Sequence, residues 1–438
     1  MLEIKPRDIN NLKPYEGNAR THSDRQVGKI AASIKQFGFN NPVLIDKNSI
    51  IIAGHGRCQA ARKLGMKTVP TICLDHLTDA EIKAYILADN KLAELAGWDR
   101  EILAIELQHL TSLELDFDVE ITGFGAGEID FIIGGAVEEK LDPADEIIEP
   151  EKEKPPVTRS GDLWHLGNHR LICGNSLDGA SYAALMGDEK AQMVFTDPPY
   201  NVPIDGHVCG NGAIKHAEFE MAAGEMSDEE FTAFLTTSMG LFRSYSDDGA
   251  IAFCCMDWRH MAEILHAGMR SSYEFKNLCV WVKDNGGMGS LYRSRHELVF
   301  VFKNGDAPHI NNVELGKNGR YRTNVWEYPG VNTMRKDRLE ELAMHPTVKP
   351  ILLVADAIKD CSKRRGIILD PFGGSGTTLI AAEKTGRQAR LIELDPHYCD
   401  VVVMRWEKLT GEKAFLEGEE TTFEEVRQQR NQEEYEND

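Results

Sequence analysis

Residues 366–382 read Gly-Ile-Ile-Leu-Asp-Pro-Phe-Gly-Gly-Ser-Gly-Thr-Thr-Leu-Ile-Ala-Ala, an apolar strand that runs through a glycine-rich turn into a helix start. Glycines there let the backbone approach a ligand closely and let the helix pack tightly on a sheet. No lysine follows them, so this is not a triphosphate-binding loop. A second apolar strand, residues 389–392, ends at Glu393, 17 residues beyond Gly376. This is near the spacing at which an acid meets ribose hydroxyls in a doubly wound α/β sheet.

A second stretch, Asp197-Pro198-Pro199-Tyr200, directly follows the short apolar strand 193–196. A carboxylate, two residues with locked φ angles and an aromatic ring make a rigid platform for a planar amine. Asp197 can accept one hydrogen bond from an NH₂ group, and the Pro198 carbonyl can accept a second. Tyr200 offers a face on which a flipped-out base can stack. Asp-Pro-Pro also ends many ordinary strands, but its combination with the glycine-rich loop and the following acid favours a functional site.

With these two motifs, residues 160–411 resemble the amino-methyltransferases that act on adenine or cytosine in double-stranded DNA with S-adenosylmethionine. Residues 197–200 match their catalytic tetrapeptide, and residues 370–378 match their cofactor loop. The tetrapeptide precedes the loop, as in the family's permuted beta class. The resemblance implies a Rossmann-like methyltransferase sheet with permuted strand order. It implies neither a metal nor a covalent intermediate.

The resemblance also implies roles for individual residues. Residues 294–300 resemble a late sheet strand, and residues 345–350 resemble the segment just before the cofactor loop. Asn175 stands where the family usually has Asp, and its carbonyl oxygen can still accept a bond from the adenine amine of the cofactor. Catalysis is expected at Asp197, Pro198, Pro199 and Tyr200. Cofactor binding is expected at Asp370, Phe372, Gly373, Gly374, Gly376, Thr377, Glu393, Asn175, Thr347 and Lys349.

The resemblance favours adenine N6 as the target, because Asp leads the tetrapeptide more often in adenine enzymes and Ser more often in cytosine enzymes. Cytosine N4 stays an alternative. Methylation of protein glutamine is less favoured, because that family carries Asn in place of Asp197 and is not permuted. A different class of function also stays open, a partition-like DNA-binding regulator whose methyltransferase half only senses cofactor. The intact motif residues argue against it.

Composition is that of a globular protein, with 42% hydrophobic and 27% charged residues. No run of 18 apolar residues and no leader-like start is present, so we expect neither a membrane span nor export. Nine cysteines without a Cys-x-x-Cys pair predict a reduced cytoplasmic protein without a zinc site. The net charge of −21 comes from residues 101–153 (−14) and 414–438 (−7). Residues 1–100 and 315–338 carry +4 each, so DNA binding stays open.

Residues 1–97 resemble the domain shared by ParB-like partition proteins and sulfiredoxin, an α+β fold. Residues 54–57, Gly-His-Gly-Arg, begin a helix whose N-terminus could bind an anion. The forked guanidinium group of Arg57 could donate further hydrogen bonds to that anion. The cysteine nucleophile of sulfiredoxin is absent, because Cys58 follows the arginine. Docking to DNA or protein without chemistry is therefore favoured over nucleotide hydrolysis, and nucleotide binding and a homodimer stay open.

The remaining boundaries follow from composition. Residues 98–133 form an acidic helical extension and residues 134–160 an acidic linker with several prolines. The methyltransferase domain is expected at 161–413, with a target recognition insert at about 284–344, followed by an acidic tail at 414–438. Basic and aromatic residues alternate in the insert, which suits phosphate contact and base readout. The expected DNA-binding residues are Lys317, Arg320, Arg322, Arg335, Lys336 and Arg338.

Overall fold

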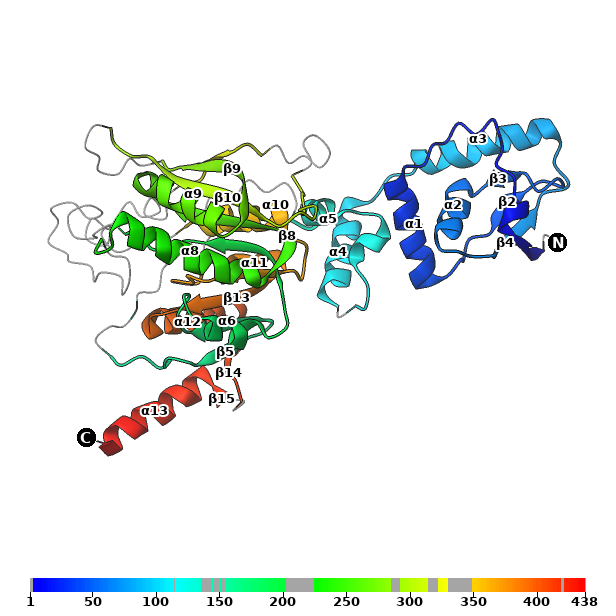
Figure 1. The fold of residues 1–438 in the computed structure, drawn as a ribbon. Helices are drawn as coiled ribbons and strands as arrows, with labels where there is room; N and C mark the ends of the chain where they lie inside the picture. The colour runs from blue at the N-terminus through cyan, green and yellow to red at the C-terminus, as the bar shows by residue number, and fades with distance from the viewer. Residues whose placement is uncertain are drawn as a thin grey trace. The chain divides into compact units, whose positions relative to one another are not determined.

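A computed structural model of the 438-residue chain describes residues 3–113, 115–134, 144, 150, 154–201, 224–284, 292–313, 322–329, 349–418 and 421–437. The chain divides into two compact units, residues 1–135 and 136–438 (Figure 1). Over the described ranges, no helix has both the length and the apolar character needed to cross a membrane.

The first unit is a small α+β fold around a mixed sheet of four strands in the order β1-β4-β2-β3. β1 (Ile4–Asp8) and β3 (Ile51–Ala53) run antiparallel to their neighbours, whereas β2 (Val43–Ile45) and β4 (Thr68–Cys73) are parallel. Its described α-helices are α1 (Asp24–Phe37), α2 (His55–Lys63), α3 (Asp79–Leu95), α4 (Arg100–Ser112) and α5 (Ala126–Gly134).

The second unit contains, in its described part, an eleven-stranded sheet in the order β11-β9-β10-β8-β7-β12-β13-β6-β5-β14-β15. Its centre, from β8 to β6, is parallel, and the flanking strands β10 and β5 are antiparallel to their inner neighbours. The strands are β5 (Leu163–Leu166), β6 (His169–Cys173), β7 (Ala191–Thr196), β8 (Ser246–Met256), β9 (Tyr273–Val282), β10 (His296–Asn304), β11 (Val325–Glu327), β12 (Ile367–Asp370), β13 (Gln388–Glu393), β14 (Phe415–Leu416) and β15 (Thr421–Thr422).

Helices cover both faces of this sheet, because its central strands are apolar on both sides. In β7, Met193 and Phe195 belong to the core beneath α10 (Ile351–Cys361), α11 (Thr377–Thr385) and α12 (Pro396–Thr410). The intervening Val194 belongs to the opposite core, beneath α6 (Gly179–Met186), α8 (Asp228–Ser244) and α9 (Met261–Arg270). Figure 1 shows α8 and α9 side by side. The expected Rossmann-like α/β class is confirmed.

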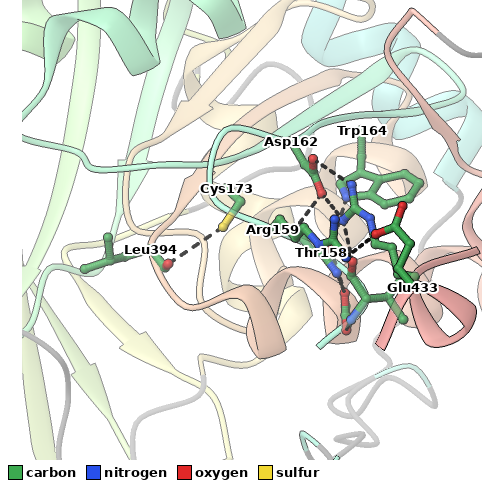
Figure 2. Close-up of polar contacts among 10 residues, drawn as sticks. Thr158, Arg159, Asp162, Trp164, Cys173, Leu394 and Glu433 are labelled. Atoms are coloured by element: carbon green, nitrogen blue, oxygen red, sulfur yellow. Dashed lines mark hydrogen bonds and ion pairs between the residues drawn. The ribbon is translucent and has the colours of Figure 1, made fainter. Parts of the chain in front are cut away.

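The C-terminal segment at 414–438, expected to be an acidic tail, contains two short strands and a helix that contact the methyltransferase fold. β14 and β15 extend the sheet edge, and α13 (Phe423–Asn437) packs against the first hairpin. The Phe423 ring is buried edge-on against Trp164, with ring centroids 5.3 Å apart. Arg430 pairs with Asp162, and Arg159 reaches Glu433 of α13 at 2.8 Å (Figure 2). Composition alone concealed these contacts, because only a few apolar and basic residues make them.

Candidate active site

The two sequence motifs meet because their strands are neighbours. β7, which ends just before Asp197, lies beside and parallel to β12, which ends at Asp370. Parallel strands end at the same edge of a sheet, so the tetrapeptide and the glycine-rich loop share that edge. On the far side of β12, the ends of β13 and β6 are joined by a hydrogen bond of 2.8 Å from Gly174 N–H to the Glu393 carbonyl. Ligands of open α/β sheets bind at such carboxyl-end edges.

The glycine-rich loop is shaped from within by Asp370. Its Oδ1 accepts from the backbone of Phe372 at 3.1 Å, and its Oδ2 accepts from the Thr378 hydroxyl at 2.6 Å. Burial raises the pKa of Asp370 to about 7. Gly376 has φ +84, and a Cβ there would lie 2.9 Å from a methyl group of Val402, so only glycine fits. Asp370 therefore ties the strand end to the start of α11.

Glu393 is half-buried at the end of β13 and faces the same loop. Its Oε2 accepts from Gly374 N–H at 2.6 Å, and its Oε1 accepts from Asp395 N–H at 2.9 Å. Burial raises its pKa to about 7, although these backbone donors oppose the shift. A carboxylate has about four acceptor positions, so ribose hydroxyls can still bind. A nucleoside placed on bare glycine backbone beside this acid fits the residues present.

The other expected cofactor residues are distributed around this loop. Gly373 N–H donates to the Ile392 carbonyl at 2.9 Å, which holds the loop on β13. The Phe372 ring lies 5.8 Å from that of Phe234. Thr377 begins α11, and the side-chain oxygen of Asn175 accepts from Leu177 N–H at 2.9 Å after β6. Thr347 lies outside the described residues.

The tetrapeptide at residues 197–200, expected from the sequence to be catalytic, forms a compact cluster of polar groups. The Tyr200 hydroxyl donates to Asp197 Oδ1 at 2.5 Å, and Lys349 Nζ donates to Asp197 Oδ2. Of the two prolines between Asp197 and Tyr200, Pro198 is buried and Pro199 is half-buried. The Asp197 side chain keeps 26% of its surface exposed, so it is accessible from the sheet edge. Burial raises the pKa of Asp197, and the ammonium group of Lys349 opposes this.

Lys349 was expected to bind cofactor, but the structure places it at the tetrapeptide. Its side chain is only 4% exposed, and Nζ lies 3.1 Å from the Tyr200 hydroxyl and 3.0 Å from Glu297 Oε2. Burial alone would lower the pKa of Lys349, but Asp197 and Glu297 raise it well above its usual value. A role of Lys349 in cofactor binding stays a prediction from the family resemblance, and in the structure its ammonium group contacts Asp197, Tyr200 and Glu297.

Glu297 is a site residue that the sequence motifs did not reveal. It lies on β10 opposite Trp281, and both Lys349 and Lys283 contact its carboxylate. Burial would raise the pKa of Glu297, but the two lysines together lower it to about 2. The available signal was one acid at the head of the apolar strand 297–302. An isolated acid in a buried strand needs a partner, which the sequence could not identify.

Comparisons with known proteins agree with this geometry. The DNA methylase family profile matches residues 191–404, which include the tetrapeptide, Glu297, Lys349 and the glycine-rich loop. The ParB N-terminal domain profile matches residues 2–90. A ParB-methyltransferase HTH domain profile matches residues 101–160.

The chain belongs to the DNA methylase family, with a ParB-type N-terminal domain. It is 26% identical over 254 residues to the type II methyltransferase M2.MboI of Moraxella bovis, covering 56% of this chain and 89% of that protein. It is 55% identical over 80 residues to the ParB-like nuclease domain-containing protein YnaK of Escherichia coli, covering 18% and 92%. Among solved structures, the M1.HpyAVI–SAM complex matches with a TM-score of 0.40 and 19% identity, covering 54% and 97%.

S-adenosylmethionine is the cofactor of the DNA methylase family and therefore of this DNA methyltransferase. The glycine-rich loop, Glu393 and the end of β6 are the residues that would hold it. In the part of the chain that the structure describes, no cluster of three or more His, Cys, Asp or Glu side chains is arranged to hold a metal ion.

Among the expected DNA-binding residues of the methyltransferase, only Arg322 is described, and it is engaged inside the protein. Its guanidinium lies 3.0 Å from Asp356 and 2.7 Å from Asp360, and it covers the Trp326 ring. These buried contacts clamp β11 to α10, so we no longer assign Arg322 to DNA. The other five expected residues, Lys317, Arg320, Arg335, Lys336 and Arg338, lie outside the described residues.

Proposed function

We propose that this enzyme transfers a methyl group from S-adenosylmethionine to the exocyclic N6 amine of an adenine flipped out of double-stranded DNA. The observation that supports this most strongly is the position of the Asp197 carboxylate. It is partly exposed beside the loop that would hold the cofactor, on adjacent parallel strands. The cellular setting that we propose is the cytoplasm, where DNA and S-adenosylmethionine occur together.

The proposed mechanism depends on orientation more than on acid or base strength. When bound, S-adenosylmethionine supplies a methyl group whose bond to sulfur breaks with the electron pair staying on sulfur. Asp197 and the Pro198 carbonyl accept hydrogen bonds from the two N–H groups of the target. These bonds favour a more tetrahedral nitrogen and free its lone pair for attack on the methyl carbon. Tyr200 stacks on the ring and fixes its plane, and the nitrogen, positively charged once it has bonded to the methyl carbon, loses one proton to solvent water.

Adenine is favoured over cytosine by the family resemblance at residue 197, since the Asp197 carboxylate could accept from the exocyclic amine of either base. A carboxylate accepts a charge-assisted hydrogen bond from an amine, which is stronger than a bond between neutral groups. By family resemblance, Asp is more frequent at this position in adenine enzymes. The test is to incubate the protein with unmethylated DNA and methyl-labelled S-adenosylmethionine and to analyse the nucleosides by mass spectrometry. We expect N6-methyladenine, and N4-methylcytosine as the labelled product would contradict the proposal.

We further propose that residues 1–97 bring the enzyme to DNA, and that residues 98–133 do not. The first segment belongs to the ParB-type domain and carries excess positive charge. Residues 101–135 belong to the HTH match but contain no Lys or Arg and eight Asp or Glu. Phosphate contact requires positive charge, so this helical segment is better suited to contact protein. The linker at 134–160 and the domain at 161–413 remain proposed boundaries.

A further inference from the structure

The charged groups around Asp197 come from several strands and loops. Lys349, which carries the ammonium group, lies just before α10 in the chain. Glu297 lies on β10, and Cys255 lies near the end of β8. Lys349 and Cys255 are buried, the Glu297 side chain is 12% exposed, and the three groups affect one another electrostatically. Among the described residues, the titratable groups that face Asp197 directly or through one neighbour are Lys349, Glu297, Tyr200, Cys255, Asp370 and Lys283.

We propose that Lys349 is a positioning residue for methyl transfer, which holds Asp197 ionised and aimed at the target amine, while Glu297 holds Lys349 in place. This inference rests on the proposed function. Neither residue needs to touch the base, because Lys349 acts through Asp197 and Glu297 acts through Lys349. Its geometric basis is one buried ammonium group in contact with both carboxylates and with the Tyr200 hydroxyl.

The first argument concerns charge. Asp197 lies near two other acids, Glu297 and Asp370, and like charges at short range favour protonation. Burial adds to this effect and raises the pKa of Asp197. A protonated carboxyl group offers a weaker acceptor to the amine than a carboxylate does. Lys349 contacts Asp197 directly and opposes this rise, so removing its charge should raise the pKa of Asp197 further and favour the protonated acid.

The second argument concerns geometry. Both carboxylate oxygens of Asp197 are engaged in the structure, Oδ1 by Tyr200 and Oδ2 by Lys349. An arriving amine therefore has to take over or share Oδ1, which frees the tyrosine hydroxyl. Lys349 already donates to that hydroxyl oxygen at 3.1 Å, so it can keep Tyr200 in place during the exchange. Oδ2 stays bound to the lysine, which fixes the orientation of the carboxylate.

Replacing Glu297 should shift the pKa of Asp197 in the direction opposite to the shift caused by replacing Lys349. Its negative charge raises the pKa of Asp197, so its replacement by the neutral amide of Gln should make Asp197 easier to ionise. Of the two carboxylates that contact Lys349, Asp197 and Glu297, only Asp197 would then keep its charge. Lys283 would also lose the negative charge of Glu297. A residue that only fills space would not shift titration in opposite directions in two neighbouring variants.

The experiment measures kcat for methyl transfer to adenine between about pH 5.5 and 9 with the full-length enzyme. Lys349→Met should move the acid limb up by about 1–3 pH units. At neutral pH, kcat should fall roughly tenfold for each pH unit by which the apparent pKa of the acid limb exceeds the assay pH. At pH 9, kcat should recover. Glu297→Gln should move the limb down. Lys276→Met is the control, because Lys276 lies on β9 beside Glu274 at the surface.

Affinity for S-adenosylmethionine, measured by calorimetry, should be unchanged in both cluster variants. Unshifted acid limbs, despite folded protein and wild-type cofactor affinity, would overturn the positioning role. If Lys349→Met does not fold, Glu297→Gln decides alone, and an unshifted or upward-shifted limb overturns the inference. The wild-type arm tests the underlying function separately, since wild-type protein that methylates no adenine contradicts the proposed reaction whatever the variants do.

Discussion

The backbone N–H of Gly374 donates a hydrogen bond of 2.6 Å to Oε2 of Glu393, so the acid expected to bind ribose also holds the glycine-rich loop. The shape of the loop and the ionisation of the acid are therefore linked. Because the pKa of Glu393 is raised to about 7 by burial, this link falls within the physiological pH range.

Cofactor binding should strengthen as pH rises from about 6 to 8, since the ionised acid is the better acceptor for ribose hydroxyls. Glu393→Ala should weaken binding by roughly 1–3 kcal/mol and remove most of this pH dependence. Calorimetric titration with S-adenosylmethionine at several pH values measures both effects. DNA affinity serves as the control and should hardly change. Unchanged cofactor affinity would move the ribose contact to another acid, with Asp395 the next candidate.

Without cofactor, the free energy of unfolding should fall as pH rises, whereas cofactor affinity should increase. Glu393 and Asp370 both have folded-state pKa values of about 7, above those of the unfolded chain. The folded protein then holds more protons than the unfolded chain between about pH 4.5 and 7, so the contribution of these acids to the free energy of unfolding falls as pH rises. Urea unfolding of Glu393→Gln should show a shallower decline than wild type. An equal slope would mean that Glu393 does not titrate in this range.

Asp197→Ala should abolish methyl transfer, with a loss of about 100-fold or more, while cofactor binding survives. The reason is separation of roles, because Asp197 faces the target amine and the cofactor would rest on the loop after β12. Filter assays with labelled cofactor and calorimetry on the same preparation measure the two properties. Lost cofactor affinity together with residual turnover would contradict the role assigned to Asp197.

The α13 contact should contribute to the stability of the methyltransferase unit. Phe423→Ala removes a ring that is 2% exposed against Trp164, and should lower the free energy of unfolding by about 3–5 kcal/mol. Glu433→Ala removes an exposed ion pair of the same helix with Arg159 and should change it by about 0.5 kcal/mol or less. Thermal melting of both variants provides the comparison, and equal melting temperatures would mean that α13 is not docked in solution.

The N-terminal unit should be dispensable for chemistry. Asp400 accepts hydrogen bonds from the backbone of Val157 and Thr158, and the Ala144 carbonyl accepts from Arg405 at 3.0 Å. Truncated chains starting at residue 141 or 156 keep the first of these contacts and should methylate DNA in vitro. Both truncations remove residues 1–100, which carry +4 and which we propose to contact DNA, together with the acidic residues 101–140, which carry −9. If residues 1–100 make the phosphate contacts, DNA affinity should weaken most at low salt despite the loss of this negative charge. Folded but inactive protein at every salt concentration would show that the N-terminal unit completes the site.

Arg322 should act on stability and not on DNA binding. Arg322→Met leaves Asp360 buried without this cation and should lower the free energy of unfolding by about 3–5 kcal/mol. The DNA affinity of the folded fraction should stay at the wild-type value. Melting curves combined with a fluorescence binding assay separate the two effects. Reduced DNA affinity in a fully stable variant would restore the role first expected from the sequence.

The sequence by itself determined the features that depend on neighbouring residues. A strand followed by Asp-Pro-Pro-Tyr, and a strand followed by glycines and a later acid, specify local backbone shapes and local chemistry. Gly376 illustrates this, because its positive φ angle and its close approach to α12 both require the absence of a side chain. These local features were sufficient to predict the fold class, the family and the cofactor.

Only the tertiary structure decided which distant groups share the site. Lys349 is 152 residues from Asp197, and the two meet because β7 lies between β8 and β12 while the segment before α10 returns to the same edge. Strand order is set by the packing of whole layers, which no local pattern encodes. Arg322 likewise resembled a DNA contact in sequence, and became a buried clamp because α10 presents Asp356 and Asp360 beside it. Charge identifies residues that need a partner, but the packing of the folded chain selects that partner.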